Sequence, residues 1–170
     1  MKNIENIKGV LREIADILAA DHKLQRLRLD DTPDLSTPMT EKDYLTARQL
    51  IDQKYISRYP VVETGVANAT RNTFLALVVN DISFSMSGNQ QRASVSVFVT
   101  TDISHYLLST AQDRGLEIVN LVCKDLDGVK IANVGRLEVS TIVSLIFDNS
   151  RAGYKITAYT VDQPNERAEI

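Results

Sequence analysis

The stretch most similar to a catalytic triad surrounds His105, whose neighbours are Asp102, Ser104 and Tyr106. Nucleophilic catalysis needs a serine or cysteine beside a base, and a further group that orients the base. Residues this close in sequence rarely converge in that geometry, and no Gly-x-Ser-x-Gly turn is present to expose a serine. We therefore expect no catalytic residue and no enzymatic activity. A small hydrolase that uses His105 with Ser104 or Ser109 is the alternative, and loss of a hydrolytic activity in folded His105→Ala protein would support it.

The residues that could bind a metal are equally few. The single cysteine, Cys123, stands beside Val122 on the apolar side of an expected helix, so we interpret it as a small core residue with a raised thiol pKa. Two histidines and one cysteine cannot form a zinc tetrad without carboxylates. Asp125-Leu126-Asp127-Gly128 resembles the start of a calcium loop, but Arg136 stands where that loop needs glutamate. We expect no metal and no cofactor.

Nucleotide and nucleic-acid binding find little support in the residues. The chain has seven glycines but no glycine-rich phosphate loop, and it has no tryptophan for base stacking. Its net charge is −3, whereas tight binding to phosphates needs a basic face. We interpret the densest basic run as the solvated end of a helix because acidic residues follow it at once: His22, Lys23, Arg26, Arg28, then Asp30, Asp31 and Asp34.

The first element that the sequence predicts is an amphipathic helix from about Asn3 to Leu29. Its apolar residues recur at spacings of three and four: Ile4, Ile7, Leu11, Ile14 and Leu18, with Val10 and Ile17 beside them. Four of them are candidates for a subunit interface, namely Ile7, Leu11, Ile14 and Leu18. The same stripe could instead cover the chain's own sheet, and the sequence leaves both readings open.

A linker separates this helix from the rest of the chain. The prolines within Asp30 to Pro38 push the preceding residues out of the helical region. We therefore divide the chain into residues 1–38, an amphipathic helix and linker, and residues 39–170, an α+β body, within a single domain overall. A second helix is expected to begin after Thr40, with Asp43 completing its cap, and to end at Arg58-Tyr59-Pro60.

The body then changes to the alternating pattern of strands. Two strands are expected from Thr73 to Met86 and from Ala93 to Val99, joined by a turn at Ser87 to Gln91. A helix follows from about Ser109 to Leu126; Gly115 weakens it and Asp127-Gly128 ends it. The remaining strands run from Val134 to Ile146 and from Gly153 to Val161. The prediction is an α+β fold: a β-β-α-β-β body with a mainly antiparallel sheet, preceded by two helices.

Length and composition are those of one ordinary globular domain. The chain has 170 residues, of which 44% are apolar and 24% charged. Its lone cysteine argues against a secreted disulfide scaffold. Charged residues interrupt the apolar positions of residues 1–20, so neither a signal peptide nor a membrane span is expected there. We expect the protein to stay in the compartment where it is made and to have no membrane partner.

The order of these elements resembles the tail terminator and neck-completion (head–tail joining) proteins of tailed bacteriophages. The resemblance covers about Lys42 to Asp162 and rests on several phrases, none diagnostic alone: Arg58-Tyr59-Pro60, the valine-rich strand Val95 to Thr100, the helix after Asp113-Arg114, Val134-Gly135-Arg136-Leu137-Glu138-Val139, and Gly153 to Asp162. It implies a virion structural protein, made in the host cytoplasm, that forms a homo-oligomeric ring, usually a hexamer. Such a ring terminates the tail tube and joins it to the connector, and DNA passes through its lumen without being read. A modest negative charge suits such a lumen.

Three alternatives remain beside that reading. The chain could be another neck, connector or tail ring protein of the virion, the hydrolase described above, or a regulatory module that binds a protein through its first helix. A portal or tail-tube gene next to this one would separate the virion readings from the other two.

Overall fold

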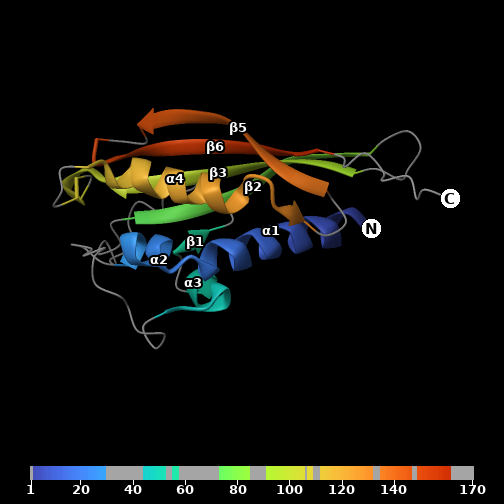
Figure 1. The fold of residues 1–170 in the computed structure, drawn as a ribbon, viewed down its shortest axis with the longest axis horizontal. Helices are drawn as coiled ribbons and strands as arrows, with labels where there is room; N and C mark the ends of the chain where they lie inside the picture. Colours follow the sequence, from blue (N-terminus) through green and yellow to red (C-terminus); the bar gives the residue numbers. More distant parts are fainter. Residues whose placement is uncertain are drawn as a thin grey trace.

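The computed structural model describes residues 2–29, 44–52, 55–57, 73–84, 91–105, 107–108, 112–131, 135–146 and 149–161 (Figure 1). At residues 2–7, 74, 81–84, 91–92 and 105 only the backbone is described. Four helices, one short 3-10 helix and six strands lie in these ranges: α1 (Lys2–Ala20), α2 (His22–Leu29), α3 (Ala47–Asp52), β1 (Ile56–Ser57), β2 (Thr73–Phe84), β3 (Gln91–Asp102), η2 (Ile103–His105), α4 (Arg114–Leu126), β4 (Lys130–Ile131), β5 (Gly135–Ile146) and β6 (Arg151–Val161).

The predicted α+β fold is confirmed. β2, β3, α4, β5 and β6 form the expected β-β-α-β-β body, and the sheet order is β1-β2-β3-β6-β5-β4. Every strand pair is antiparallel except β1 with β2. The two short outer strands, β1 and β4, were not predicted, because two residues are too few to show an alternating pattern. β1 lies where the second helix was expected to continue to Arg58, and that expectation was wrong, since α3 ends at Asp52.

The N-terminal helix is two helices rather than one. Asp21 interrupts it, and its carboxylate accepts a hydrogen bond from the backbone N–H of Leu24 at 3.0 Å. An aspartate at this position satisfies a backbone donor that would otherwise have no partner, and so it starts a new helix. The continuous apolar stripe did not reveal this break, since both helices face the same core.

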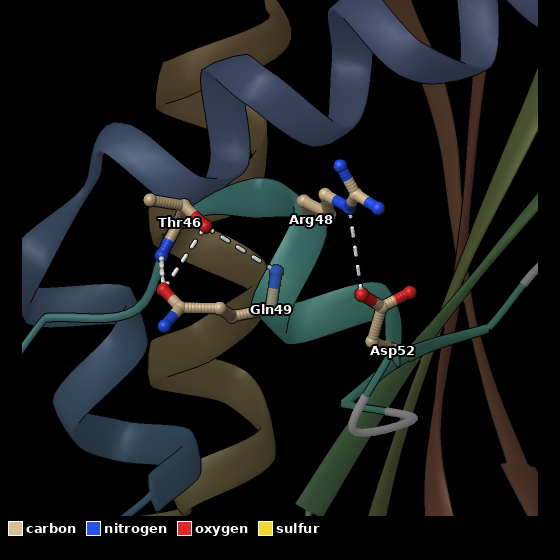
Figure 2. A network of polar contacts seen from close by, with 4 residues as sticks. All are labelled: Thr46, Arg48, Gln49 and Asp52. Atoms are coloured by element: carbon tan, nitrogen blue, oxygen red, sulfur yellow. Dashed lines mark hydrogen bonds and ion pairs between the residues drawn. The ribbon is translucent and has the colours of Figure 1, made fainter.

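The helix predicted from Thr40 begins later than expected. Residues 44–46 are not helical, and α3 begins at Ala47. Figure 2 shows the reason: Thr46 Oγ1 accepts from the backbone N–H of Gln49 at 3.3 Å, while Gln49 Oε1 accepts from the backbone N–H of Thr46 at 2.8 Å. This reciprocal pair is a capping box. The cap assigned to Thr40 and Asp43 lies outside the described residues.

α4 also begins later than Ser109, at Arg114. Asp113 caps it by accepting from the backbone N–H of Leu116 at 2.9 Å, and the hydroxyl of Tyr154 on β6 donates to the other carboxylate oxygen at 2.6 Å. Gly115 does not break this helix. It stands in the first turn, where a Cβ would lie 3.1 Å from the ring of Tyr154, so a small residue lets helix and strand approach. The predicted end at Asp127-Gly128 is confirmed, with Gly128 at φ +82°.

The register of β5 changes along its length. A bulge between Val139 and Thr141 leaves Ser140 without a partner residue on β6. An extra residue in one strand moves every later side chain to the opposite face. Leu137 is fully buried, whereas Val143, six residues later, is 46% exposed and pairs with Lys155. Val143 therefore lies on the face of the sheet opposite to Leu137.

One core joins the N-terminal helices to the sheet. Ile14 and Leu18 of α1 belong to the same buried cluster as Leu75 of β2, Val97 of β3 and Ile118 of α4. In Figure 1, α1, α2 and α3 lie together on one side and β5 lies on the opposite side, with α4 between them, running alongside the strands. The N-terminal helices are thus part of the hydrophobic core of the body. Several other predicted features lie outside the described residues: the linker Asp30 to Pro38, Arg58-Tyr59-Pro60, most of the Ser87 to Gln91 turn, Val134 and the last residues from Asp162.

Candidate functional site

The residues around His105 form a local turn. Asp102 Oδ1 accepts from the hydroxyl of Ser104 at 2.6 Å and from its backbone N–H at 2.9 Å. An aspartate that binds the residue two positions later is an ordinary turn motif at the end of a strand. The backbone of His105 ends the 3-10 helix η2. These contacts place Asp102 and Ser104 in one local turn at the end of β3.

Cys123 and the run Asp125 to Gly128, which resembles the start of a calcium loop, both lie at the C-terminal end of α4. Burial raises the pKa of the Cys123 thiol, and the charge of Asp127 raises it further, so the thiol stays protonated at neutral pH. Cys123 is partly buried and packs against the core. Asp127 caps the helix, and its carboxylate accepts from the backbone N–H of Val139 at 3.0 Å, which joins α4 to β5. Within the described ranges, no group of three or more metal-binding side chains occurs.

A pair of carboxyl groups, not anticipated from the sequence, connects α4 to the junction of α1 and α2. Burial raises the pKa of Asp125 to about 6, and the charge of Asp21 and a hydrogen bond with it add to the effect. The Oδ2 atom of Asp125 is buried without a hydrogen-bond partner. The two residues stand far apart in sequence, so only the tertiary structure brings them together.

Arg28 is buried, which corrects the interpretation of the basic run as a solvated helix end. Its side chain is 3% exposed, Nη2 donates to the backbone carbonyl of Tyr55 at 2.7 Å, and Nε and Nη1 have no hydrogen-bond partner. Burial lowers the pKa of Arg28 to about 9. Leu24 and Leu27 of α2 are fully buried as well, and Arg28 follows them on the inner side of the helix. This guanidinium joins α2 to the chain before β1.

The four candidate interface residues lie along α1. Ile14 and Leu18 are completely buried in the chain's own core, so they have no surface left for a neighbouring subunit. Leu11 is partly buried and packs against the same core. The side chain of Ile7 is outside the described part of the chain. Leu11, Ile14 and Leu18 therefore pack against the chain's own core, as in the alternative in which the helix covers its own sheet.

Large apolar side chains are exposed at one end of the sheet instead. Ile103 is 51% exposed, Leu107 63%, Leu116 46% and Ile146 85%. Three contacts hold their elements together: Ile103 N–H donates to Ser150 O at 2.8 Å, Leu107 forms a β-bridge with Asp113, and Tyr154 binds Asp113. In Figure 1 the first turn of α4 and the tip of β5 point to the same end of the molecule, at the left. We call these four residues the end patch.

A second exposed surface runs along the outer side of β5. β4 pairs with β5 only at Arg136 and Gly135, and Val129 binds Leu137 next to it. From Ser140 onward every residue of β5 is exposed except Leu145, which is partly buried, and Ile142 is 50% exposed. We call residues 139–146 the β5 edge. The sequence already distinguishes this stretch, because residues 139–146 contain no charged residue.

Comparison with known proteins finds no protein family whose sequence profile matches the chain, and no curated protein that matches it. None of the helices in the described ranges is long and apolar enough to span a bilayer.

Proposed function

We propose that this chain is a virion structural protein of a tailed bacteriophage. It forms a homo-oligomeric ring at the head–tail junction, a hexamer as the resemblance implies, and the ring terminates the tail tube and joins it to the connector. We assign the chain to the neck of the virion because the order of its elements, and several short sequences between Lys42 and Asp162, resemble those of neck and tail terminator proteins. The observation that carries an assembly role is the end patch.

The end patch has the properties of a docking surface. It consists of four large, exposed apolar side chains from η2, the residues before α4, α4 itself and β5. Exposed apolar side chains that cluster, rather than scatter, mark surfaces that another protein covers. A ring at a junction needs such a surface on each side that meets a partner.

The test uses the full chain with the tail-tube protein and the connector protein of the same virus. We expect the wild-type chain to bind assembled tubes in a pelleting assay and to appear as a ring at the tube end by negative-stain electron microscopy. Leu107→Lys and Ile146→Lys each place a charge in the end patch and should reduce binding at least about tenfold, equivalent to 1.4 kcal/mol or more. Asn120→Lys, at an exposed position elsewhere on α4, is the matched control and should bind normally. A folded wild-type chain that binds neither the tail-tube protein nor the connector protein would refute the proposal.

A further inference from the structure

Arg28 is a buried cation whose hydrogen-bonding groups are mostly unused. Its side chain is 3% exposed, and Nη2 donates to the backbone carbonyl oxygen of Tyr55 at 2.7 Å. Nε and Nη1 are buried without a hydrogen-bond partner, so the N–H groups on these two nitrogens are unused. Tyr55 O has no further capacity for them, because it also accepts from the backbone N–H of Leu75 at 3.0 Å.

This guanidinium is charged without a counter-charge from any described residue. Burial lowers the pKa of Arg28 to about 9, which still leaves the side chain protonated at neutral pH. Within the described part of the chain, Tyr55 is the one titratable group that acts on this pKa, and no ion pair includes Arg28. A buried charge is costly unless something pairs with it. An oxyanion has the missing chemistry, because it supplies both a negative charge and acceptor oxygens.

Two threonine hydroxyls that are buried without partners lie opposite each other in the sheet. Thr73 begins β2, and the register pairs it with Thr101 near the end of β3. Both residues are completely buried, and neither Oγ1 atom has a hydrogen-bond partner. Alternate residues of a strand share a face, so Thr73 lies on the same face as Leu75. Thr101 likewise shares a face with Val99, and this is the face of the sheet that packs against the helices.

The contacts of Arg28 place its guanidinium beside this end of the sheet. α2 packs against β2, and Tyr55 O joins Nη2 of Arg28 to the backbone of Leu75. Leu75 is only two residues from Thr73 and on the same face. The unused N–H groups of Arg28 and the unused hydroxyls of β2 and β3 are therefore in one region of the interior.

A second buried guanidinium comes from the first turn of α4. Arg114 is 1% exposed, and its Nη1 donates to the carbonyl oxygen of Leu27, the residue before Arg28, at 3.5 Å. In Figure 1 the end of α2, the first turn of α4 and the start of β2 lie at the same end of the molecule, at the left. Two positive charges and two threonine hydroxyls thus lie where α2 ends, α4 begins and the β2–β3 pair ends.

We propose that Arg28, Thr73 and Thr101 form a binding site for a small oxyanion of the phosphate or carboxylate type, with Arg114 as a second positive charge beside it. Guanidinium N–H groups and hydroxyls all donate to the oxygens of such an anion, and charge-assisted hydrogen bonds are the strong ones. Because these groups are buried, the bound anion stabilises the folded chain over the unfolded one. The site lies inside the chain and the end patch on its surface, so the inference does not rest on the proposed function.

The experiment is thermal unfolding of the purified full chain at pH 7, after dialysis into chloride, followed by circular dichroism. About 10 mM phosphate or acetate, compared with chloride at equal ionic strength, should raise the melting temperature of the wild-type chain by about 2–4 °C. A shift with phosphate alone identifies the anion as phosphate-like, and a shift with acetate alone identifies it as carboxylate-like.

Three variants test the residues of the site. Arg28→Met removes the charge, and Thr73→Val and Thr101→Val remove the hydroxyls while they keep the shape of the side chain. Each should reduce the anion-dependent shift to less than about 1 °C. Arg12→Met, at a side chain that is 83% exposed on α1, and Thr141→Val, at an exposed position on β5, are the matched controls and should keep the full shift. The two valine variants keep the test decisive if Arg28→Met does not fold.

Two results would overturn the inference. One is a wild-type chain whose melting temperature changes with neither phosphate nor acetate. The other is an equal shift in the wild-type chain and in the site variants, because phosphate also stabilises folded proteins in general by its exclusion from their surface. Binding to the tail tube and the connector is measured separately, so either proposal can fail while the other stands.

Discussion

The sharpest test of how the N-terminal helices are attached is the replacement of Gln25 by methionine. Gln25 lies on α2 and is 1% exposed. Its Nε2 donates to the carbonyl of Ala19 at 2.6 Å and to the carbonyl of Leu45 at 2.7 Å, and its Oε1 accepts from the N–H of Leu45 at 2.9 Å. One side chain thus fastens the end of α1 and the extended residues before α3 to α2.

The expected loss follows from those three hydrogen bonds. Methionine has nearly the same shape as glutamine but cannot make any of them. Each hydrogen bond contributes about 1 kcal/mol net, so three amount to roughly 3 kcal/mol. Partial access of water to Leu45, which is half-buried, and the greater hydrophobicity of methionine reduce this figure. We expect Gln25→Met to lower the free energy of unfolding by about 2–3 kcal/mol.

The measurement is urea unfolding followed by circular dichroism, at one protein concentration for all variants because association would add to the apparent stability. Asn120→Met, the loss of an exposed amide on α4, is the control and should change stability by less than about 0.5 kcal/mol. A loss below about 1 kcal/mol for Gln25→Met would contradict the reasoning, since it would mean that these contacts contribute less than a single ordinary hydrogen bond.

Three further predictions concern stability. Folding raises the pKa of Asp125 from 3.8 to about 6. The contribution of the protonated carboxyl to the free energy of unfolding is therefore fully present below pH 4 and is lost as the pH rises through about 6. Discounted for partial exposure, Asp125→Asn should stabilise the chain by about 1 kcal/mol at pH 7.5 and by nearly nothing at pH 4 in urea titrations; an equal effect at both pH values would be evidence against this account. A Cβ at Gly153 would overlap the backbone carbonyl oxygen of Val99, so Gly153→Ala should cost about 1–3 kcal/mol in thermal unfolding, and an unchanged melting temperature would show that the strands can separate freely. Thr46→Ala removes the cap of α3 and should cost about 1 kcal/mol, whereas Arg48→Ala, which breaks only an exposed ion pair at 3.7 Å, should cost less than about 0.5 kcal/mol; equal losses would show that the capping box has no special role.

Local patterns in the sequence were sufficient for the order and type of the main elements. The alternation in Ala93 to Val99 and in Gly153 to Val161 predicted β3 and β6, because a strand with one buried face must alternate. The glycine after Asp127 predicted the end of α4, because few other residues adopt a positive φ. The spacing of Ile14 and Leu18 predicted the buried face of α1 but not its partner.

The tertiary structure alone decided where those elements meet. The apolar stripe of α1 suits a neighbouring subunit as well as a sheet of the same chain, and only the fold shows that the sheet takes it. The bulge at Ser140 depends on the register between β5 and β6, which local sequence does not encode, and it is this bulge that turns Val143 away from the core. The pairing of Asp21 with Asp125 and the burial of Arg28 also arise from segments distant in the chain. Periodicity specifies which face of an element is buried, since that depends on the element's own geometry; which surface covers that face depends on the packing of all the elements together.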